Sequence, residues 1–457
     1  MVSEQPNVLL ISVDSLRADQ TSFCGGYEGT TPYLDELATD STVFQRAITP
    51  ATWTLPSHAS LFTGLYPPEH GVFDRGDALG EIQTLAEILA GRDYETRSYG
   101  YLEWFQLGGI LRGFDHTNTS RLGNSDSESL STRAIDRVLD TLGDRRWQVL
   151  ELARSLSFSG FNRADHRTVD TVLADATEVN EPFCFFVHLN TVHWPYTPPT
   201  PYHRLFSDIS CRTLLANRSY WQQRIFFNRG AVASGEIEVP KTIQQQIREQ
   251  YRGAIRQADD QIQRLLSGLS EHIDLEETLV VILGDHGDNI GEEGLFGHHF
   301  SVSDSLIRVP LLVHDPTETL DTGIRTDVVQ TLDVFQTLMD LLDINIDRSQ
   351  STSLLSQEAR EHAFTYYDPP NSFVDYVTSQ SPRAADRATP KYSAWNSPEK
   401  KVIWLPEEET YQGASDGELR ETLRNHYAAL IENDRYHDSE GDVAQAAVKR
   451  LEQMGYL

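Results

Sequence analysis

The sequence predicts an α/β protein in which a doubly wound, mostly parallel β-sheet carries helices on both faces and a small α+β subdomain follows at the C-terminus. Three observations lead to this fold class. Uninterrupted apolar runs of strand length occur at residues 7–13, 183–189 and 279–283, as is typical of parallel strands covered on both faces. Helical patterns separate these runs, and such alternation produces right-handed crossovers. After about residue 345 the chain changes to loops rich in Ser, Gln and Pro.

The first hundred residues contain two clear helix starts. Thr31 and Pro32 are typical of an N-cap followed by a first turn. Thr54 and Pro56 begin a helix that we expect to end at Gly64. The elements expected in this part are strands at 7–13 and 43–48 and helices at 32–40, 54–63 and 82–90.

The rest of the chain suggests one large domain and one small one. We expect the large domain over residues 1–345, with insertions or helical cover at 117–180 and 203–245, and the subdomain over 346–457. The further strands expected are 183–189, 279–283, 310–314, 363–367 and 401–405, and the further helices are 243–269, 327–342 and 443–454.

The charge balance excludes some partners. The formal net charge is −30, with 68 acidic residues against 38 basic ones, and only five of the basic residues are lysines. Dense carboxylates keep a surface hydrated when salt screens other interactions, so the composition indicates a halophilic protein, the alternative being an ordinary acidic one. Nucleic acid is excluded as a partner, because binding to its phosphates requires basic patches.

The cysteines and the hydropathy favour a soluble cytoplasmic protein. Cys24, Cys184 and Cys211 are an odd set without CxxC spacing, which argues against a disulfide framework and a zinc knuckle. No apolar run reaches the length of about 18 residues that a membrane span requires. We see no signal peptide, since the first strand begins almost at once.

Chemically useful side chains follow the expected strands. Asp14, His193 and Asp285 each come at or just after a strand end. Ligands of doubly wound sheets gather at the C-terminal ends of the strands, so we expect these residues to meet there. Asp14, Asp285 and His286 offer two carboxylates and an imidazole, which suit Mn²⁺, Zn²⁺, Mg²⁺ or Ca²⁺. The alternative is that Asp14 caps a helix and His286 is a satisfied buried histidine.

Other candidates have two interpretations each. Thr54, at a helix start that attracts anions, is a nucleophile if a metal lowers the pKa of its hydroxyl, or else a plain capping residue. His193 and His298 could protonate a leaving group or hold an anion, or could be structural loop histidines. Arg17 and Asp19 form a local ion pair or orient the first loop. Asp288 could hold His286 in one tautomer.

Together these motifs resemble the sulfatase family of the alkaline phosphatase superfamily. The resemblance rests on segments in the family's order: NVLLISVDSLRAD, TPYLDELA, TWTLPSHASLFTGLYPPEHGV, HLNTVHWPYTPP, LGDHGDNIGEEGLFGHH, IRVPLLV and the closing VKRLEQMGYL. It implies an alkaline phosphatase-like fold, with residues 1–345 as the catalytic domain. It also implies that Asp14, Thr54, Asp285 and His286 bind a divalent metal, that Thr54 is the nucleophile, and that His193 and His298 contact the substrate anion and leaving group.

The chain departs from the family pattern at the nucleophile. Sulfatases place Cys or Ser there and convert it to formylglycine, whereas this chain has Thr54, whose Cβ methyl group blocks that conversion. His58 stands where the family has Arg, and Ser15 stands where many members have a second metal-binding Asp. Asp285 with His286 replaces the Asp-Asn pair common in calcium sulfatases, which favours Mn²⁺ or Zn²⁺ over Ca²⁺.

The predicted function is therefore a metal-dependent hydrolase of a sulfate or phosphate ester, with a small molecule or a glycan as substrate. Phosphoesters, including phosphodiesters, are slightly favoured, because a metal-held hydroxyl transfers phosphoryl groups without formylglycine. The alternatives are a phosphotransferase acting on a glycan or lipid headgroup, and a non-catalytic binding relative. The complete set Asp14, Thr54, Asp285, His286 and His298 argues against the last of these.

Overall fold

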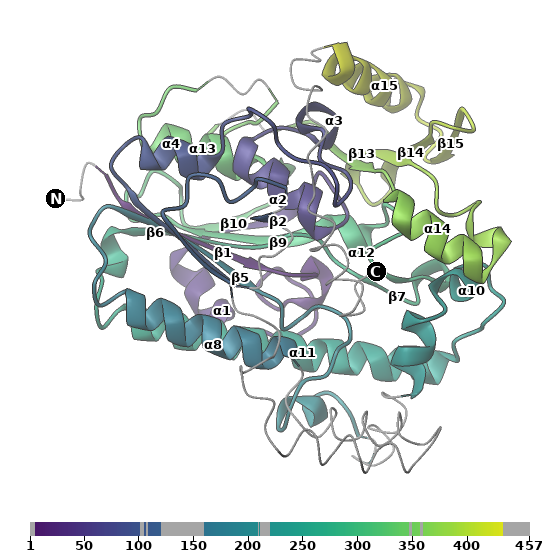
Figure 1. Cartoon of the computed structure of the whole chain (residues 1–457), viewed down its shortest axis with the longest axis horizontal. Helices are drawn as coiled ribbons and strands as arrows, with labels where there is room; N and C mark the ends of the chain where they lie inside the picture. The colour runs from purple at the N-terminus through teal and green to yellow at the C-terminus, as the bar shows by residue number, and fades with distance from the viewer. Residues whose placement is uncertain are drawn as a thin grey trace.

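A central β-sheet lies between two layers of helices. The computed structural model describes residues 5–100, 105–106, 108–119, 160–208, 210, 220–346, 350–356 and 360–432. Figure 1 shows α2, α4 and α13 on one side of this sheet and α1, α8 and α11 on the other. The bounds of these helices are Thr54–Thr63, Leu85–Ala90 and Asp333–Leu341 on the first side, and Pro32–Leu37, Gly160–Asp175 and Lys241–Leu269 on the second. The doubly wound arrangement is confirmed.

The sheet is mostly parallel. Its strand order within the described residues is β10-β2-β9-β6-β1-β5-β3-β4, with β11 pairing with β2. Only β9 runs antiparallel to its two neighbours, β2 and β6. The strands are β1 Asn7–Val13, β2 Thr42–Ile48, β3 Glu95–Gly100, β4 His116–Thr119, β5 Phe183–Leu189, β6 Thr278–Gly284, β9 Arg308–His314, β10 Gly323–Arg325 and β11 Val329–Gln330.

The central strand β1 explains why the apolar runs are continuous. Val8 and Leu10 belong to the core beneath α2 and α13, whereas Leu9 and Ile11 belong to the core beneath α8 and α11. All four side chains are fully buried. Because both faces of the strand are covered, alternation of apolar and polar residues would leave a polar side chain in one core.

Helix α2 carries Thr54 and is held at both ends. Its C-terminus is capped by Gly64, which has a φ of 70° and would bring a Cβ to 2.7 Å from Phe335 of α13. Glycine adopts this left-handed conformation without strain and permits the close contact. The first turn of α2 lies at the edge of the sheet where β6 ends, because Ser57 Oγ donates to Asp285 O at 2.7 Å.

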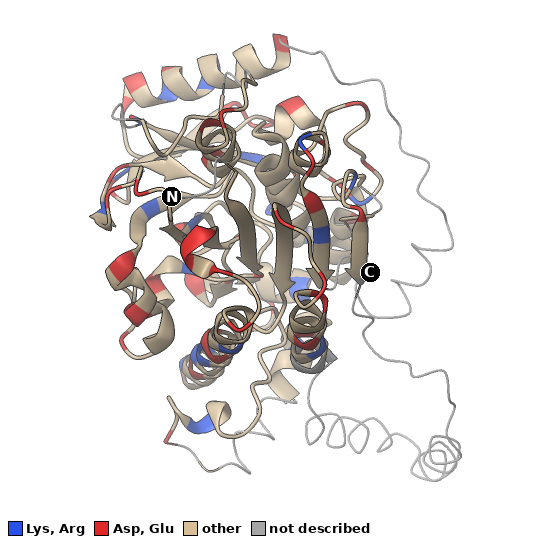
Figure 2. Ribbon diagram, turned by 90° about the vertical axis from the view of Figure 1, so that its left-hand side faces the viewer, with Lys and Arg blue, Asp and Glu red and all other residues tan. Residues whose placement is uncertain are grey.

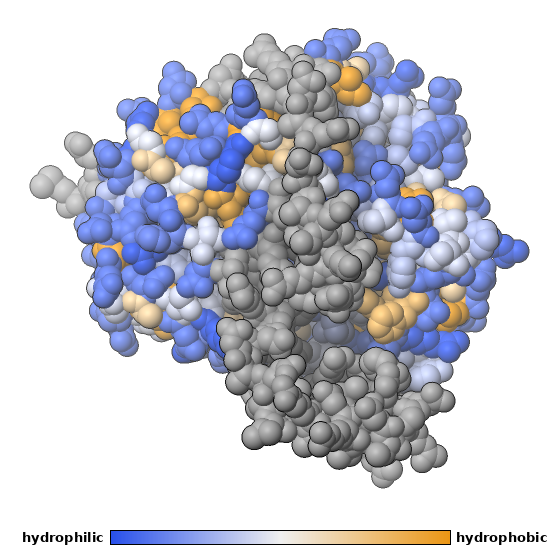
Figure 3. All heavy atoms as spheres, in the orientation of Figure 1, coloured by the Kyte–Doolittle hydropathy of each residue, from blue (hydrophilic) through white to orange (hydrophobic). Residues whose placement is uncertain are grey.

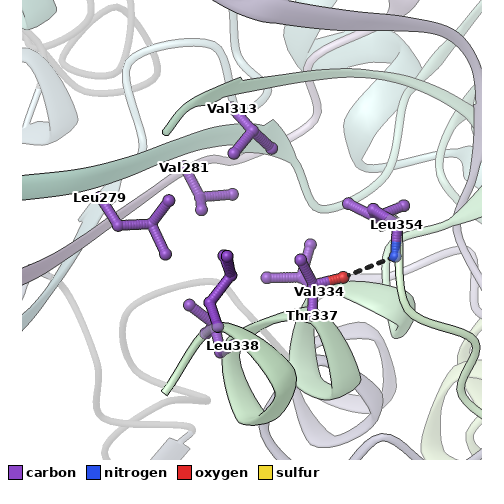
Figure 4. A pocket seen from close by; sticks show the side chains of 8 residues that line it. Leu279, Val281, Val313, Val334, Thr337, Leu338 and Leu354 are labelled. Atoms are coloured by element: carbon purple, nitrogen blue, oxygen red, sulfur yellow. Dashed lines mark hydrogen bonds between the residues drawn. The ribbon is translucent and has the colours of Figure 1, made fainter. Parts of the chain in front are cut away.

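Between α13 and the sheet lies a small apolar pocket (Figure 4). It is lined by Leu279, Val281, Val313, Val334, Thr337, Leu338, Leu341 and Leu354. The Thr337 hydroxyl donates to Asp333 O at 2.7 Å and accepts from Leu354 N at 2.8 Å. The pocket therefore belongs to the packing of α13 and lies under the sheet rather than at its C-terminal edge.

The C-terminal part forms a second, antiparallel sheet, as expected. Its strands are β12 Ala363–Tyr367, β13 Lys391–Ser397, β14 Lys400–Leu405 and β15 Thr410–Gly413, paired in that order. Helices α14 Asn371–Gln380 and α15 Gly417–Glu432 accompany it (Figure 1). The domain boundary at residue 345 stays a prediction, and the helix expected at 443–454 lies outside the described residues.

Some expected elements have different bounds. The prediction of a helix over 327–342 is wrong for its first turns, because residues 329–330 pair with β2. Helix α13 starts only at Asp333, whose carboxylate accepts from Gln330 N at 2.8 Å. The helix expected at 82–90 begins at Leu85, after Thr84, which forms a capping box with Glu87.

Of the segment expected as cover at 117–180, residues 117–119 and 160–180 can be compared with the prediction, and residues 120–159 lie outside the described residues. Its first residues belong to edge strand β4 of the main sheet, and α8 packs over the sheet as cover. Strands β3, β10, β13 and β15 and helix α15 had no sequence prediction. The segment 203–245 includes α10 Arg229–Ala233 and the start of α11.

The surface is strongly acidic and mostly polar. Figure 2 shows Asp and Glu spread over the outward faces of the helices, and Figure 3 shows hydrophobic residues only in small patches on one face. In the described part of the chain, no helix combines the length and the apolar character that a bilayer span requires.

Salt should stabilise this fold if the acidic surface is an adaptation to salt. Raising KCl from about 0.1 M to about 2 M screens carboxylate repulsion, and we expect Tm to rise by about 5 °C or more. Differential scanning calorimetry at both concentrations checks this. A Tm that stays constant or falls would identify an ordinary acidic protein.

Candidate active site

Three strands end at the same level and deliver the first candidate residues. Val13, the last residue of β1, pairs with Leu189 of β5 and with Gly284 of β6. Asp14 and Asp285 directly follow two of these strands, and Asp14 N donates to Leu189 O at 2.9 Å. The expected meeting of side chains at this edge is therefore present.

Thr54 and His286 face each other across this edge. Thr54 Oγ1 lies 3.1 Å from His286 Nε2. His286 Nδ1 lies 2.8 Å from Gly287 O, and since a carbonyl only accepts, Nδ1 carries the proton. Nε2 is then left with a lone pair that points toward the Thr54 hydroxyl. The other close neighbours of His286 Nε2 are Asp14 Oδ1 at 3.7 Å and Asp285 Oδ2 at 3.5 Å.

The two aspartates are buried, and their surroundings shift their pKa values in opposite directions. Burial alone would raise the pKa of Asp14, but His193, His188 and His286 around it hold that pKa well below its ordinary value. Burial, and then the negative charge of Asp14, raise the pKa of Asp285 well above its ordinary value. Two carboxylates this close share one proton unless a cation neutralises them.

The donor set fits a divalent cation. Asp285 Oδ1 accepts from Ser15 N at 3.0 Å and from His286 N at 2.7 Å, whereas Asp285 Oδ2 is buried and has no hydrogen-bond partner. Ligand atoms of Asp14, Asp285 and His286 all lie within 4.8 Å of one another. An orphaned carboxylate oxygen beside an imidazole lone pair is typical of a metal site and costly without one.

His298 and His193 lie next to this group. The His298 ring centroid is 4.8 Å from that of His286 and 5.8 Å from that of His193. His298 Nδ1 lies 3.2 Å from Asp288 Oδ1, so Nε2 is directed away from Asp288. His193 Nδ1 donates to Trp194 O at 2.6 Å. Burial, and then the charges of His286 and His193, lower the pKa of His298.

Asp288 and Arg17 lie around this group of residues. The prediction that Asp288 orients His286 is wrong, because His286 Nδ1 donates to Gly287 O. Asp288 instead accepts from Tyr196 OH at 2.5 Å and contacts His298. Arg17 forms the local ion pair expected with Asp19, with two contacts of 2.8 Å.

The structure adds residues that the sequence did not single out. Asn190 Nδ2 donates to Asp14 Oδ2 at 3.2 Å, and the only signal for it was its place directly after β5. Beneath it, His188 Nδ1 lies 3.4 Å from Ser12 Oγ, which lies 2.8 Å from His58 Nε2. His58 Nδ1 in turn donates to Thr54 O at 2.8 Å.

This buried chain of hydrogen bonds ties the first turn of α2 to β1. His58, where the family has Arg, is fully buried and packs against the ring of Phe105 at 4.6 Å. It therefore supports Thr54 from below and does not reach a substrate.

A buried aspartate behind Asn190 gives a stability prediction. Asp165 of α8 accepts from Thr191 Oγ1 at 2.7 Å, and burial raises its pKa from 3.8 to about 6. As the pH rises through this window, the unfolded chain ionises first, so the folded state loses stability. Asp165→Asn lacks this penalty.

We expect Asp165→Asn to be about 2 kcal/mol more stable than the wild type near pH 8 and to differ little near pH 4. Chemical denaturation at both pH values measures this. If the difference in the free energy of unfolding between Asp165→Asn and the wild type were the same at both pH values, the pKa of Asp165 would not be raised by folding.

The sequence is similar to those of known proteins. A family model described as Sulfatase matches residues 6–344. An arylsulfatase of Clostridium perfringens is 24% identical over 390 residues, covering 80% of each chain. The multifunctional alkaline phosphatase superfamily protein PehA of Trinickia caryophylli is 24% identical over 384 residues, covering 74% of this chain and 73% of its own.

The fold is also that of a solved relative. The phosphonate monoester hydrolase of Agrobacterium radiobacter superposes with a TM-score of 0.69 at 19% identity, covering 94% of this chain and 95% of its own. Since the family model spans most of the chain and includes Asp14, Thr54, Asp285 and His286, this protein belongs to the sulfatase family.

Proposed function

We propose that this protein is a metal-dependent hydrolase of sulfate or phosphate esters in which Thr54 is the nucleophile. The observation that carries the proposal is the 3.1 Å contact between Thr54 Oγ1 and His286 Nε2, at the point where Asp14 and Asp285 converge. A plain capping threonine would have no reason to meet an imidazole lone pair and two carboxylates.

Asp14, Asp285, His286 and Thr54 would hold the cation. Two carboxylates, one imidazole and one hydroxyl favour Mn²⁺ or Zn²⁺, with Ca²⁺ possible. When bound, the cation lowers the pKa of the Thr54 hydroxyl and neutralises negative charge on the oxygens of the substrate.

Each of the site residues then has its own role in the reaction. The Thr54 hydroxyl loses its proton to solvent, and its oxygen forms a bond to phosphorus or sulfur in line as the bond from that atom to the leaving alcohol breaks. The N–H groups of the first turn of α2 favour the anionic group placed there. His298, held by Asp288 at Nδ1, presents Nε2 to the leaving alcohol and gives it a proton taken up from solvent; His193, next to it, is the second candidate for this transfer. Water then attacks the ester formed on Thr54.

Phosphoesters, including phosphodiesters, are favoured over sulfates. Because Thr54 carries a methyl group at Cβ, formylglycine cannot form there, and an unmodified hydroxyl must attack directly. Phosphoryl transfer to such a hydroxyl depends mainly on positioning and charge neutralisation, which the site supplies. Small molecules and glycans are the substrates we expect. The cytoplasmic location and the halophilic character stay predictions.

A substrate panel tests the proposal. Aryl sulfates, aryl phosphates and phosphodiesters are assayed with Mn²⁺, Zn²⁺ and Ca²⁺ at low and high salt. Turnover of at least one ester class that requires added metal supports it, and product formed on an added alcohol would identify the phosphotransferase instead. No turnover of any ester with any metal would overturn it.

A further inference from the structure

Two polar residues lie side by side in the buried middle of the sheet. Ser12 of β1 pairs in register with His188 of β5, and both are fully buried. The residues before and after each of them are apolar and buried. A buried polar side chain costs free energy unless its hydrogen bonds are made, so packing alone does not explain a serine and a histidine here. The hydrogen bonds of this pair lead to α2, which covers the sheet on this side (Figure 1).

The hydrogen bonds between this pair and α2 have a defined direction. His58 Nδ1 lies 2.8 Å from Thr54 O, and since a carbonyl only accepts, Nδ1 carries the proton. His58 is fully buried, which favours the neutral ring, so its Nε2 accepts from the Ser12 hydroxyl at 2.8 Å. Because the Ser12 hydrogen is used in this way, the Ser12 oxygen accepts from His188 Nδ1, which lies 3.4 Å away.

The same direction continues from His188 to Asp14. With its proton on Nδ1, His188 keeps a lone pair on Nε2, and Asn190 Nδ2 donates to it at 3.2 Å. The same amide nitrogen donates its second hydrogen to Asp14 Oδ2, also at 3.2 Å. Asp14 Oδ2 itself lies 3.6 Å from His188 Nε2, too far for a hydrogen bond, so Asn190 links the two. One continuous chain of hydrogen bonds thus runs from Asp14 through the sheet to the backbone of Thr54.

We propose that Ser12 and His188 are positioning residues that hold Thr54 and Asp14 in a fixed relation to each other. Thr54 starts α2 and Asp14 follows β1, so these two candidate ligands come from separate elements. This role rests on the proposed function, in which both residues hold one cation. Hydrogen bonds that form on folding place the two ligands in advance, so ordering them costs less free energy when the metal binds.

A matched pair of serine variants tests this role. Ser60 Oγ of α2 lies 3.0 Å from His70 Nε2, and both residues are buried, but His70 Nδ1 accepts from Val72 N, so this pair does not lead to the site. Ser12→Ala and Ser60→Ala each remove one buried serine–histidine hydrogen bond, and we expect similar decreases in Tm. Only Ser12→Ala should weaken binding of Mn²⁺ and Zn²⁺, by about tenfold or more, against less than about twofold for Ser60→Ala. Titration calorimetry on the metal-free proteins measures both affinities.

Kinetics separate positioning from stability. At saturating metal, Ser12→Ala should lower kcat about tenfold while KM stays within about twofold, because the start of α2 that carries the nucleophile is less well placed. Ser12→Cys keeps a weak donor of similar size, so its metal affinity and kcat should lie between those of Ser12→Ala and the wild type. Unchanged metal affinity and kcat in Ser12→Ala, or equal losses in Ser60→Ala, would overturn the proposal.

Nitrogen NMR of the histidine rings needs neither metal nor turnover. We expect His58 and His188 to be neutral with the proton on Nδ1, and their signals are identified by their loss in His58→Gln and His188→Gln. Because the wild type is measured, the result decides even if Ser12→Ala does not fold. A proton on Nε2 of either ring would break the chain of hydrogen bonds and overturn the proposal. If the metal affinities follow the expected pattern but no ester is hydrolysed, the positioning role stands and the hydrolase proposal fails. If the wild type binds no metal, both are wrong.

Discussion

Thr54→Ala should abolish hydrolysis of every ester that the wild type hydrolyses, with kcat falling by about 10⁴ or more. The reason is that Ala removes the atom that attacks. The hydroxyl of Thr54 lies 3.1 Å from His286 Nε2, and no other hydroxyl of the described residues makes this contact. Thr54→Ser should keep turnover within about tenfold of the wild type, because it retains the hydroxyl.

A second threonine of the same helix serves as the control. Thr63 donates to Ala59 O at 2.6 Å, at the end of α2 far from His286, so Thr63→Ala should leave kcat nearly unchanged. Thermal unfolding of each variant shows that it is folded. Full turnover by folded Thr54→Ala would make the assignment of the nucleophile wrong.

Asp285→Asn should lower the affinity for the activating metal by about 100-fold or more and remove most of the activity at limiting metal. The change keeps an oxygen for the N–H groups of Ser15 and His286. It also turns the charged carboxylate, whose unpartnered Oδ2 lies 3.5 Å from His286 Nε2, into a neutral amide. Excess metal should restore part of the activity.

The metal content is read by mass spectrometry after dialysis, and the affinity by titration of activity. Asp368→Asn is the control. Asp368 is a half-buried aspartate whose pKa is raised to about 6 by partial burial, but it lies in the C-terminal part, where Tyr392 OH donates to it. If both variants lost metal equally, or if neither did, the cation would not be held by Asp285.

The strands and the ligand-bearing ends were predictable because burial on two faces leaves a clear pattern. Asn7–Val13 and Phe183–Leu189 are mostly apolar and fully buried, and their bounds agree with the sequence prediction. Short elements were not predictable in this way. Val329–Gln330 forms β11 by pairing with β2, a contact distant in sequence, so helical periodicity around it misled the prediction of a helix from residue 327.

The candidate site, too, was predictable only in part. Asp14 and Asp285 could be found because each directly follows an apolar strand, and parallel strands deliver their ends to one edge. The hydrogen bonds between side chains could not be predicted from the sequence. Which atom orients His286, and which hydroxyl donates to Asp288, depend on rotamers and on distant packing that a single sequence does not display.

The most direct measurement is the mass of Thr54 during turnover. The enzyme is mixed with its best ester and metal, quenched in acid, digested, and examined by tandem mass spectrometry. We expect a phosphoryl or sulfuryl group on the Thr54 oxygen in the wild type and on the serine oxygen in Thr54→Ser, and no such group when metal is left out. A group found on another residue, or rapid turnover without any covalent adduct on Thr54, would contradict it.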